Sequence, residues 1–399
     1  MIISKILKND LCIGCGLCSS VLGHHRCDMS LDRSKGFYYP KLNKDVNDGI
    51  IKKICPGITI HGNGHHGIWG NVVEVVEGWS ASPDIRYKAA SGGVVTSLAI
   101  YLLETRKVDA VLQVGVRRDS YIYNELQVSK CKEDVLRNAQ SRYAPALTLY
   151  NIKELLDNSD EKYAFIGKPC DIAGIKNLCK EYPQYNNRFE LFISIFCAGM
   201  PSYEATAKTW RLSGRKDEPC QLKYRGDGWP GNFKATWADG ETFELSYNDS
   251  WGKILGRNVC FRCKICPDGI GLLADIAVGD SWNTKDGYPD FTEEDGRCFV
   301  FIRSRKGSDL LSEARDKEYL KYHKLPIDKI QEMQPYQYER RKFVWWRLLP
   351  IYLISPRLLQ YGGLGLFRQA VNGNIVVGIK NFKGASKRYL KMRWEAVKK

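Results

Sequence analysis

Apolar and polar positions along the chain alternate between short extended runs and helical stretches. Residues 72–79, 110–116, 163–167, 192–196 and 276–278 are brief apolar runs, which predict buried strands. Residues 92–103 and 152–156, which lie between these runs, are predicted as helices. Because strands that alternate with helices are typical of an α/β core, the fold class predicted is α/β (α+β), with a mixed α/β core.

The two ends of the chain depart from this alternation. Residues 1–75 are interrupted by frequent glycines, which predicts a small loop-rich module that a metal cluster could stabilise. Residues 331–399 combine cations with aromatics and are predicted to be helical, with breaks at Pro350, Pro356 and Gly362-Gly363. The predicted divisions are therefore 1–75, 76–165, 166–330 and 331–399. Within the third, residues 233–245 alternate around Asp239-Gly240, a hairpin signal.

Length, hydropathy and charge limit the class of protein. The 399 residues are 44% apolar and 26% charged, as in a globular protein with more than one domain. We find neither a signal peptide nor a membrane-spanning apolar run, so a cytoplasmic location is expected. The net charge is +15, and residues 331–399 hold 14 Lys and Arg against 3 Asp and Glu, so the basic character belongs mainly to this tail.

Fourteen cysteines are the most unusual feature of the composition, and in a reducing compartment clustered cysteines more often bind metal than form disulfides. Cys12, Cys15 and Cys18 have the spacing of three ligands of a 4Fe–4S cluster, and Cys55-Pro56 has the form of the distant fourth ligand. Cys27 is a rival fourth ligand but is not followed by proline. A zinc site, the alternative, usually pairs two separate Cys-x-x-Cys hooks.

A second set of cysteines repeats the compact spacing at Cys260, Cys263 and Cys266. Cys170 and Cys197 each follow a predicted strand, where α/β folds place their chemistry, although both could be small buried residues.

A segment that could bind phosphate precedes the helix predicted at 92–103. Ser91-Gly92-Gly93 leads into this helix, and Thr96 lies in its first turn. Glycines before a helix let backbone N–H groups approach a phosphate, although the same residues could simply cap the helix in a tight turn.

Together these motifs resemble the beta subunit family of coenzyme F420 hydrogenases and dehydrogenases. The resemblance runs from about residue 5 to about residue 310, in family order. It rests on the following residues: Ser91-Gly92-Gly93 with Thr96, Ser141-Arg142-Tyr143, Gly167-x-Pro169-Cys170 with Ala173-Gly174, Phe196-Cys197-x-Gly199, the Cys263/Cys266 pair, and Ala274-Asp275-Ile276 through Trp282.

The resemblance implies particular cofactors. It implies a non-covalent FAD, contacted by Ser91, Gly92, Gly93, Thr96, Ser141, Arg142 and Tyr143. It also implies a 4Fe–4S cluster beside the flavin, held by Cys170, Cys197, Cys263 and Cys266. Cys12, Cys15, Cys18 and Cys55 would then form a ferredoxin-like extension, so that two 4Fe–4S clusters and FAD are expected.

Two departures from the family pattern concern the same region. Lys168 stands where members often have a small hydroxyl residue, and it is the catalytic candidate. Its charge could contact an anionic substrate or raise the reduction potential of the nearby cluster or flavin. The alternative is that Lys168 is simply a solvated lysine. Cys260 adds a third thiol and could replace Cys170 or Cys197 as a ligand.

The function implied is that of an iron–sulfur flavoprotein oxidoreductase, which passes electrons between the clusters and FAD to reduce or oxidise a small organic substrate or coenzyme. The alternative is an electron-transfer subunit that serves a partner hydrogenase or dehydrogenase. A one-electron donor such as a ferredoxin is the expected partner.

The basic, aromatic tail suggests a further contact. Residues 340–347 and 387–394 would suit an anionic membrane at its inner face, unless they pack their aromatic side on the body. No nucleic-acid module accompanies the charge, so nucleic acid is not expected.

Overall fold

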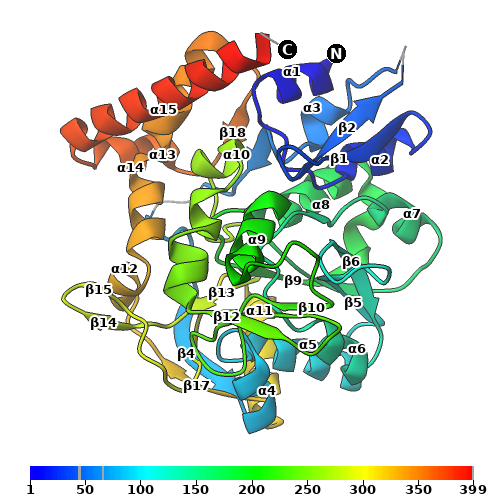
Figure 1. Ribbon diagram of the computed structural model, residues 1–399, viewed down its shortest axis with the longest axis vertical. Coiled ribbons are helices and arrows are strands. Elements are labelled where there is room, and N and C mark those ends of the chain that lie inside the picture. Colours follow the sequence, from blue (N-terminus) through cyan, green and yellow to red (C-terminus); the bar gives the residue numbers. More distant parts are fainter. Residues whose placement is uncertain (44–45, 65–66, 398–399) are drawn as a thin grey trace.

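A nine-stranded mixed sheet organises the molecule (Figure 1). The computed structural model describes residues 1–43, 46–64 and 67–397. In spatial order the strands are β17 (Leu320–Lys324), β4 (Glu74–Ser80), β16 (Cys298–Ile302), β13 (Ile276–Asp280), β9 (Phe189–Ile195), β8 (Tyr163–Gly167), β5 (Ala110–Val116), β6 (Asn124–Ser129) and β7 (Ala146–Leu147). The β5–β8, β8–β9 and β9–β13 pairings are parallel, whereas the β13–β16, β16–β4 and β4–β17 pairings are antiparallel. The predicted α/β class is confirmed.

Helices cover both faces of the sheet. One face packs against α5 (Val94–Glu104), α6 (Lys132–Asn138) and α11 (Arg305–Asp316), with α4 (Pro83–Lys88) beside β4. The other packs against α7 (Ile152–Asp157) and α8 (Pro169–Glu181). Side chains of a strand alternate between the two cores: Ala164 faces α5 and Phe165 faces α8. The strands predicted at 110–116 and 163–167 have the observed bounds.

The N-terminal segment shares the core of the sheet's α8 face. Its elements are α1 (Ile2–Lys8), α2 (Leu17–Leu22), β1 (Cys27–Asp32), β2 (Phe37–Leu42), α3 (Ile51–Ile54) and β3 (Thr59–His61). Ile6 and Ile54 are buried in the same cluster as Phe165 of β8 and Leu348 of the tail. Apolar packing therefore holds this segment against both the sheet and the tail.

A smaller layer lies over the carboxyl ends of the parallel strands. It contains α9 (Tyr203–Trp210), α10 (Phe261–Lys264) and the sheet formed by β10 (Gln221–Lys223), β11 (Phe233–Thr236) and β12 (Thr242–Leu245). Strands β14 (Asn283–Lys285) and β15 (Tyr288–Asp290) form a separate hairpin. Short 3-10 or π turns span Pro183–Arg188, Arg211–Ser213, Asn248–Gly252 and Leu255–Arg257. The predicted turn at Asp239-Gly240 is confirmed, because Thr236 pairs with Thr242 across it.

The tail is helical, as predicted, but one of its predicted breaks is wrong. It consists of α12 (Lys329–Met333), α13 (Pro335–Ile354), β18 (Gln360–Gly362), α14 (Leu366–Val371) and α15 (Ile375–Val397). Helix α13 continues through Pro350. A proline costs the helix one hydrogen bond, and here Leu348 and Ile351, both fully buried, hold the flanking turns in the core. Strand β18 pairs in parallel with β3, which ties the tail to the N-terminal segment.

Candidate functional site

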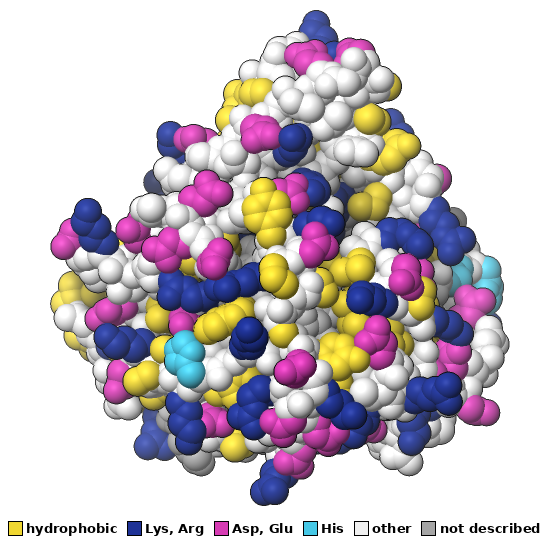
Figure 2. Space-filling view, turned by 90° about the horizontal axis from the view of Figure 1, so that it is seen from below, with side chains coloured by type: hydrophobic (Ala, Val, Ile, Leu, Met, Phe, Trp, Pro, Cys, Tyr) yellow, Lys and Arg dark blue, Asp and Glu magenta, His cyan; other side chains and the backbone are white. Residues whose placement is uncertain are grey.

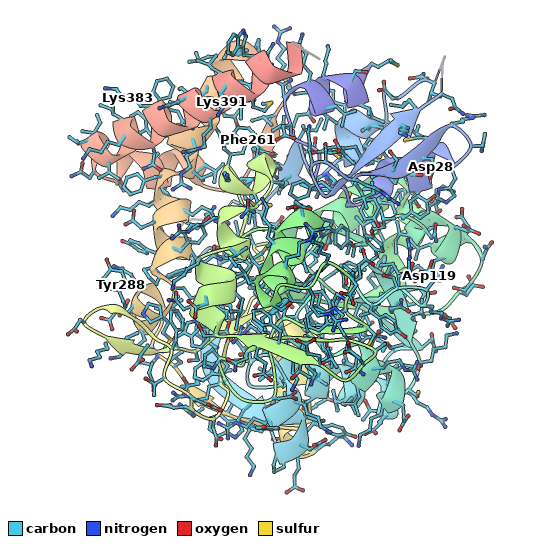
Figure 3. The ribbon with its side chains drawn as sticks, in the orientation of Figure 1. Asp28, Asp119, Phe261, Tyr288, Lys383 and Lys391 are labelled. Atoms are coloured by element: carbon cyan, nitrogen blue, oxygen red, sulfur yellow. The ribbon has the colours of Figure 1, made fainter. Side chains whose placement is uncertain are left out.

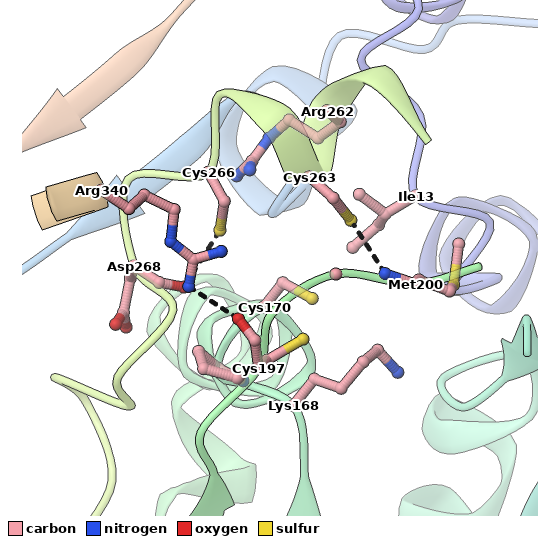
Figure 4. Close-up of a pocket in the computed structure, with 12 residues that line it drawn as sticks. Ile13, Lys168, Cys170, Cys197, Met200, Arg262, Cys263, Cys266, Asp268 and Arg340 are labelled. Carbon is pink, nitrogen blue, oxygen red and sulfur yellow. Dashed lines mark hydrogen bonds between the residues drawn. The ribbon is translucent and has the colours of Figure 1, made fainter. Parts of the chain in front are cut away.

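The second cysteine set converges on one buried cavity. Cys170 lies in the first turn of α8, directly after β8, and Cys197 follows the end of β9. Cys263 lies in α10 and Cys266 follows it. All four side chains line the same cavity, beside Ile13 of the N-terminal segment (Figure 4). The sequence prediction that these four distant thiols meet is therefore supported by their placement, while their role as ligands stays a prediction.

Backbone contacts fix the loops that carry these thiols. The Met200 amide donates to Cys263 Sγ at 3.4 Å, and Arg340 Nη2 donates to the Cys197 carbonyl at 2.6 Å. Gly199 has a φ of +142°, and a Cβ there would lie 2.9 Å from Val259 Cγ1. Only glycine allows the strand-end loop to approach the cysteine loop this closely. Cys260, the rival ligand, lies 3.2 Å from Cys263 Sγ but does not line the cavity.

The electrostatics of the cavity suit thiolates bound to iron. Burial raises the pKa of the Cys197 thiol to about 12, and the neighbouring Cys263 thiol adds to this effect. Burial likewise raises the pKa of Cys170. Such thiols lose their protons only where positive charge compensates them, and Lys168, Arg262 and Arg340 line the same cavity. Four thiols with cations around them are the donor set that a 4Fe–4S cluster needs.

The spacing of ligands differs between a single metal ion and an iron–sulfur cluster. In the described part of the chain, no three His, Cys, Asp or Glu side chains are grouped closely enough to hold a single ion. The ligands of a cluster bind separate irons at the corners of a cube, so they are spaced more widely than the ligands of one zinc. The 4Fe–4S cluster at these four thiols stays a prediction.

The first cysteine set also gathers in space. Burial, together with the nearby Cys55 thiol, raises the pKa of Cys15 to about 12, which places these two thiols in one electrostatic environment. The Gly14 amide donates to Cys12 Sγ at 3.4 Å. Cys18 interacts with Cys27 through their side chains, and this contact raises the pKa of Cys18. Both rival fourth ligands, Cys55 and Cys27, thus lie beside the triple, and the choice of Cys55 stays a prediction.

Arg262 connects the two cysteine sets. It lies between Cys260 and Cys263 in sequence and is fully buried. Its Nε donates to the Gly57 carbonyl at 2.7 Å, and its Nη2 donates to the Pro56 carbonyl at 3.0 Å. These carbonyls directly follow Cys55. One guanidinium therefore joins the loop of the second set to the last predicted ligand of the first.

Replacing Arg262 with methionine is expected to lower the free energy of unfolding by about 1–3 kcal/mol. The Pro56 carbonyl loses its donor, and the Gly57 carbonyl keeps only the hydrogen bond from the Tyr361 hydroxyl. Urea denaturation followed by circular dichroism measures the change. Arg257→Met is the matched control, since Arg257 is exposed and donates one 3.3 Å bond to Gly252. Equal stabilities of the two variants would contradict the bridging role of Arg262.

A larger cavity of about 330 Å³ adjoins the thiol cavity. Lys168, Cys197, Gly199 and Met200 line both cavities, so the two are contiguous. The larger one is lined by these residues of the predicted flavin contacts: Ser91, Gly93, Thr96, Ser141, Arg142 and Tyr143.

Two predicted contacts have additional structural roles. Gly92 does not line the cavity: a Cβ there would lie 2.9 Å from the Gly78 carbonyl oxygen, so this glycine lets the turn pack against β4. Arg142 donates to Asn124 Oδ1 of β6 at 2.6 Å and to the Leu222 carbonyl of β10 at 2.9 Å, which joins these two strands beside the cavity. Gly93, with a φ of +77°, caps the start of α5 at the cavity.

Lys168 stands at the junction of the two cavities. Its Nζ lies 2.6 Å from Asp171 Oδ2, and the Asp171 side chain is fully buried. The other carboxylate oxygen, Asp171 Oδ1, is buried without a hydrogen-bond partner. Lys168 is thus an ion-paired lysine rather than a solvated one, and its contact with a substrate stays a prediction.

Sequence reasoning missed the charged and aromatic wall of the larger cavity. Arg225 forms a two-pronged ion pair with Asp280, at 2.9 and 3.0 Å, and its guanidinium lies over the rings of Tyr247 and Trp282. Trp229 Nε1 donates to the same carboxylate at 3.1 Å. The position of Asp280 at the end of β13 was the available signal, because polar residues at strand ends face the sites of α/β folds.

Comparisons with known proteins agree with this arrangement. Residues 75–153 match the family model for the N-terminal part of the coenzyme F420 hydrogenase/dehydrogenase beta subunit. Residues 160–327 match the model for the C terminus of the same coenzyme F420 hydrogenase/dehydrogenase beta subunit. The two matches together cover the sheet and both cavities, apart from the N-terminal segment and the tail.

Two related proteins have names that describe coenzyme F420-dependent enzymes. The chain is 31% identical to the F420-dependent formate dehydrogenase 1 subunit beta of Methanococcus maripaludis, over 61% of this chain and 59% of that one. It is 24% identical to the coenzyme F420-dependent sulfite reductase of Methanocaldococcus jannaschii, over 83% of this chain and 50% of that one. The chain thus spans between half and three fifths of these two relatives.

A solved structure shares the fold. The F420-reducing [NiFe] hydrogenase complex from Methanosarcina barkeri contains a chain that superposes with a TM-score of 0.54 and 20% identity, over 69% of this chain and 92% of that one. Both family models describe the beta subunit of coenzyme F420 hydrogenases and dehydrogenases. The chain described here belongs to the coenzyme F420 hydrogenase/dehydrogenase beta subunit family.

Proposed function

We propose that the chain is an electron-transfer subunit of an oxidoreductase, with FAD in the larger cavity and a 4Fe–4S cluster at each cysteine set. The observation that carries the proposal is the contiguity of the two cavities through Lys168, Cys197, Gly199 and Met200. A buried four-thiol site that opens onto a cavity of about 330 Å³ suits a cluster next to an organic cofactor.

The residues of the larger cavity suit a flavin nucleotide. The first turn of α5, with Val95 and Thr96 on the cavity, presents backbone N–H groups that have no partner within the helix, and these suit a pyrophosphate. Tyr143, Tyr247, Trp251 and Trp282 provide aromatic surface. FAD, when bound, exchanges electron pairs with organic molecules and single electrons with iron.

The chain itself holds the centres and excludes water from them. Arg262 and the shared apolar core hold the two cysteine sets in fixed positions relative to each other. Burial of Cys170 and Cys197 shields the second set from solvent. Lys168 with Asp171 places a cation at the passage between the cavities. These roles require no substrate of the chain's own, which agrees with relatives that are named as subunits.

A second function, reduction of a small organic substrate or coenzyme by this chain alone, is supported by one relative. The F420-dependent sulfite reductase, which matches 83% of this chain, is named as an enzyme with its own substrate. The match covers 50% of that relative, so the region it shares with this chain is only half of the enzyme. We therefore favour the electron-transfer function.

Anaerobic purification tests the proposal. We expect about eight iron atoms and about one flavin per chain, as two 4Fe–4S clusters and one FAD require. A one-electron reductant should bleach the flavin absorption, and reduced coenzyme F420 should do the same if the partner enzymes use it. Turnover of an added organic substrate by the isolated chain would favour the second function, and an iron-free, zinc-loaded protein would contradict both.

A further inference from the structure

Helix α15 is fixed to the body by one of its faces. Ala385 and Tyr389 are buried, and the Tyr389 ring stacks on Phe261 of α10 with centroids 5.9 Å apart. Arg347 Nε of α13 donates to Asn381 Oδ1 at 2.7 Å. Since these contacts recur every three or four residues, they define an inner face and leave the opposite face of α15 outward.

The outer face of α15 carries lysines. Figure 3 shows Lys383 and Lys391 along this helix, with Phe261 on the side of the body. The exposed cations of the helix are Lys380, Lys383, Lys387, Arg388 and Lys391. Exposed apolar side chains accompany them at Val376, Ile379, Leu390 and Trp394. We call these residues the outer face.

Exposed apolar side chains also gather where α14 meets α15. Phe367 and Val371 of α14 are each 59% exposed, and Ile375 at the start of α15 is 63% exposed. Single exposed apolar residues are ordinary, but several on two adjoining helices form a patch that normally has a partner. We call these three residues the apolar corner.

Positive charge dominates this region. No Asp or Glu occurs between Glu339 and Glu395 in the sequence. The opposite end of the molecule differs, because Figure 2 shows Asp and Glu side by side with Lys and Arg there. Residues 366–394 thus carry lysines and large apolar side chains and contain no acidic residue, while Glu395 follows near the end of α15.

We propose that the outer face and the apolar corner bind the surface of an anionic lipid bilayer. Lysines attract anionic headgroups, and Phe, Ile and Trp enter the boundary between headgroups and acyl chains. None of the helices in the described residues is both long and apolar enough to cross a bilayer. The contact is therefore peripheral, and it is independent of the function proposed above.

Lipid accounts for these residues better than an acidic protein does. Four of the five cations are lysines, which act as compact point charges, whereas arginine dominates where carboxylates are bound in two-pronged pairs. The apolar corner also exposes more than half of each of its three side chains, which leaves them accessible to a lipid surface.

Vesicle flotation of the full chain tests the proposal. The wild type should float with vesicles of phosphatidylcholine and phosphatidylglycerol and remain unbound with phosphatidylcholine alone. The triple variant Lys380→Glu, Lys383→Glu and Lys387→Glu should lower the partition coefficient by about a hundredfold or more, since each lysine near the surface contributes about a factor of five. The double variant Ile375→Ser and Phe367→Ser should weaken vesicle binding but leave the salt dependence of that binding unchanged.

Deletion of the tail is not a usable test, because Arg340 and Arg341 of α13 are buried beside the second cysteine set. The control is Lys132→Glu, Lys216→Glu and Lys321→Glu, which changes three exposed lysines elsewhere. The proposal would be overturned if the wild type bound neutral vesicles as well as anionic ones. It would also be overturned if the control variant lost as much binding as the triple variant of α15. So would binding to a soluble polyanion without binding to anionic vesicles, which would assign the surface to an acidic partner. Circular dichroism confirms that each variant is folded.

Discussion

Replacing Cys263 with serine should remove about four of the eight iron atoms expected per chain. Cys263 lines the cavity with Cys170, Cys197 and Cys266, and its sulfur accepts the Met200 amide. Serine keeps the shape of the side chain but supplies a hard alcohol in place of a soft thiolate, so the cluster of the second set loses a ligand. Iron and sulfide analysis of anaerobically purified protein measures the change.

The first cysteine set provides an internal reference for this experiment. Its cluster signal in electron paramagnetic resonance should persist in Cys263→Ser, while electron delivery to the flavin slows. Cys131→Ser is the matched control, because Cys131 is exposed and lies at the start of α6. Full iron content in Cys263→Ser would show that the second set does not hold a cluster through this residue.

Changing Asp280 to asparagine should lower the free energy of unfolding by about 3–5 kcal/mol, because a buried guanidinium loses its counter-charge. The Arg225 side chain is only 3% exposed and that of Asp280 19% exposed. Trp229 also loses a charged acceptor. Urea denaturation of the protein without flavin isolates the stability effect, and flavin titration measures the accompanying loss of affinity.

The exposed cluster around Arg215 supplies the control for this change. Asp217 pairs with Arg215 at 2.7 Å, but its side chain is 56% exposed, so Asp217→Asn should leave the urea midpoint almost unchanged. If Asp280→Asn and Asp217→Asn change the urea midpoint by the same amount, the Arg225–Asp280 pair does not stabilise the cavity wall.

Much of the core could be predicted because its signals are local. Strands such as 110–116 and 163–167 are short apolar runs bounded by polar residues, and burial on both faces of a central strand requires such a run. The cysteine spacings and Ser91-Gly92-Gly93 are equally local. The meeting of Cys170, Cys197, Cys263 and Cys266 followed from strand-end positions combined with a family resemblance.

The rest depends on contacts between distant segments. The pair of Arg225 with Asp280 joins residues 55 apart, and no spacing rule links them. The β18–β3 pairing joins two three-residue strands that are too short to show alternation. Pro350 was expected to end a helix, and only the core around Leu348 and Ile351 explains why it does not.

The parallel pairing of β18 with β3 also sets an order of events during synthesis. Strand β3 begins four residues after Cys55, and its partner is made some 300 residues later. A ribosome therefore releases the tail long after the first cysteine set has emerged. Until then the edge of β3 is open, and the N-terminal segment lacks the neighbour that completes its core. The first set thus reaches its final surroundings only when translation is nearly finished.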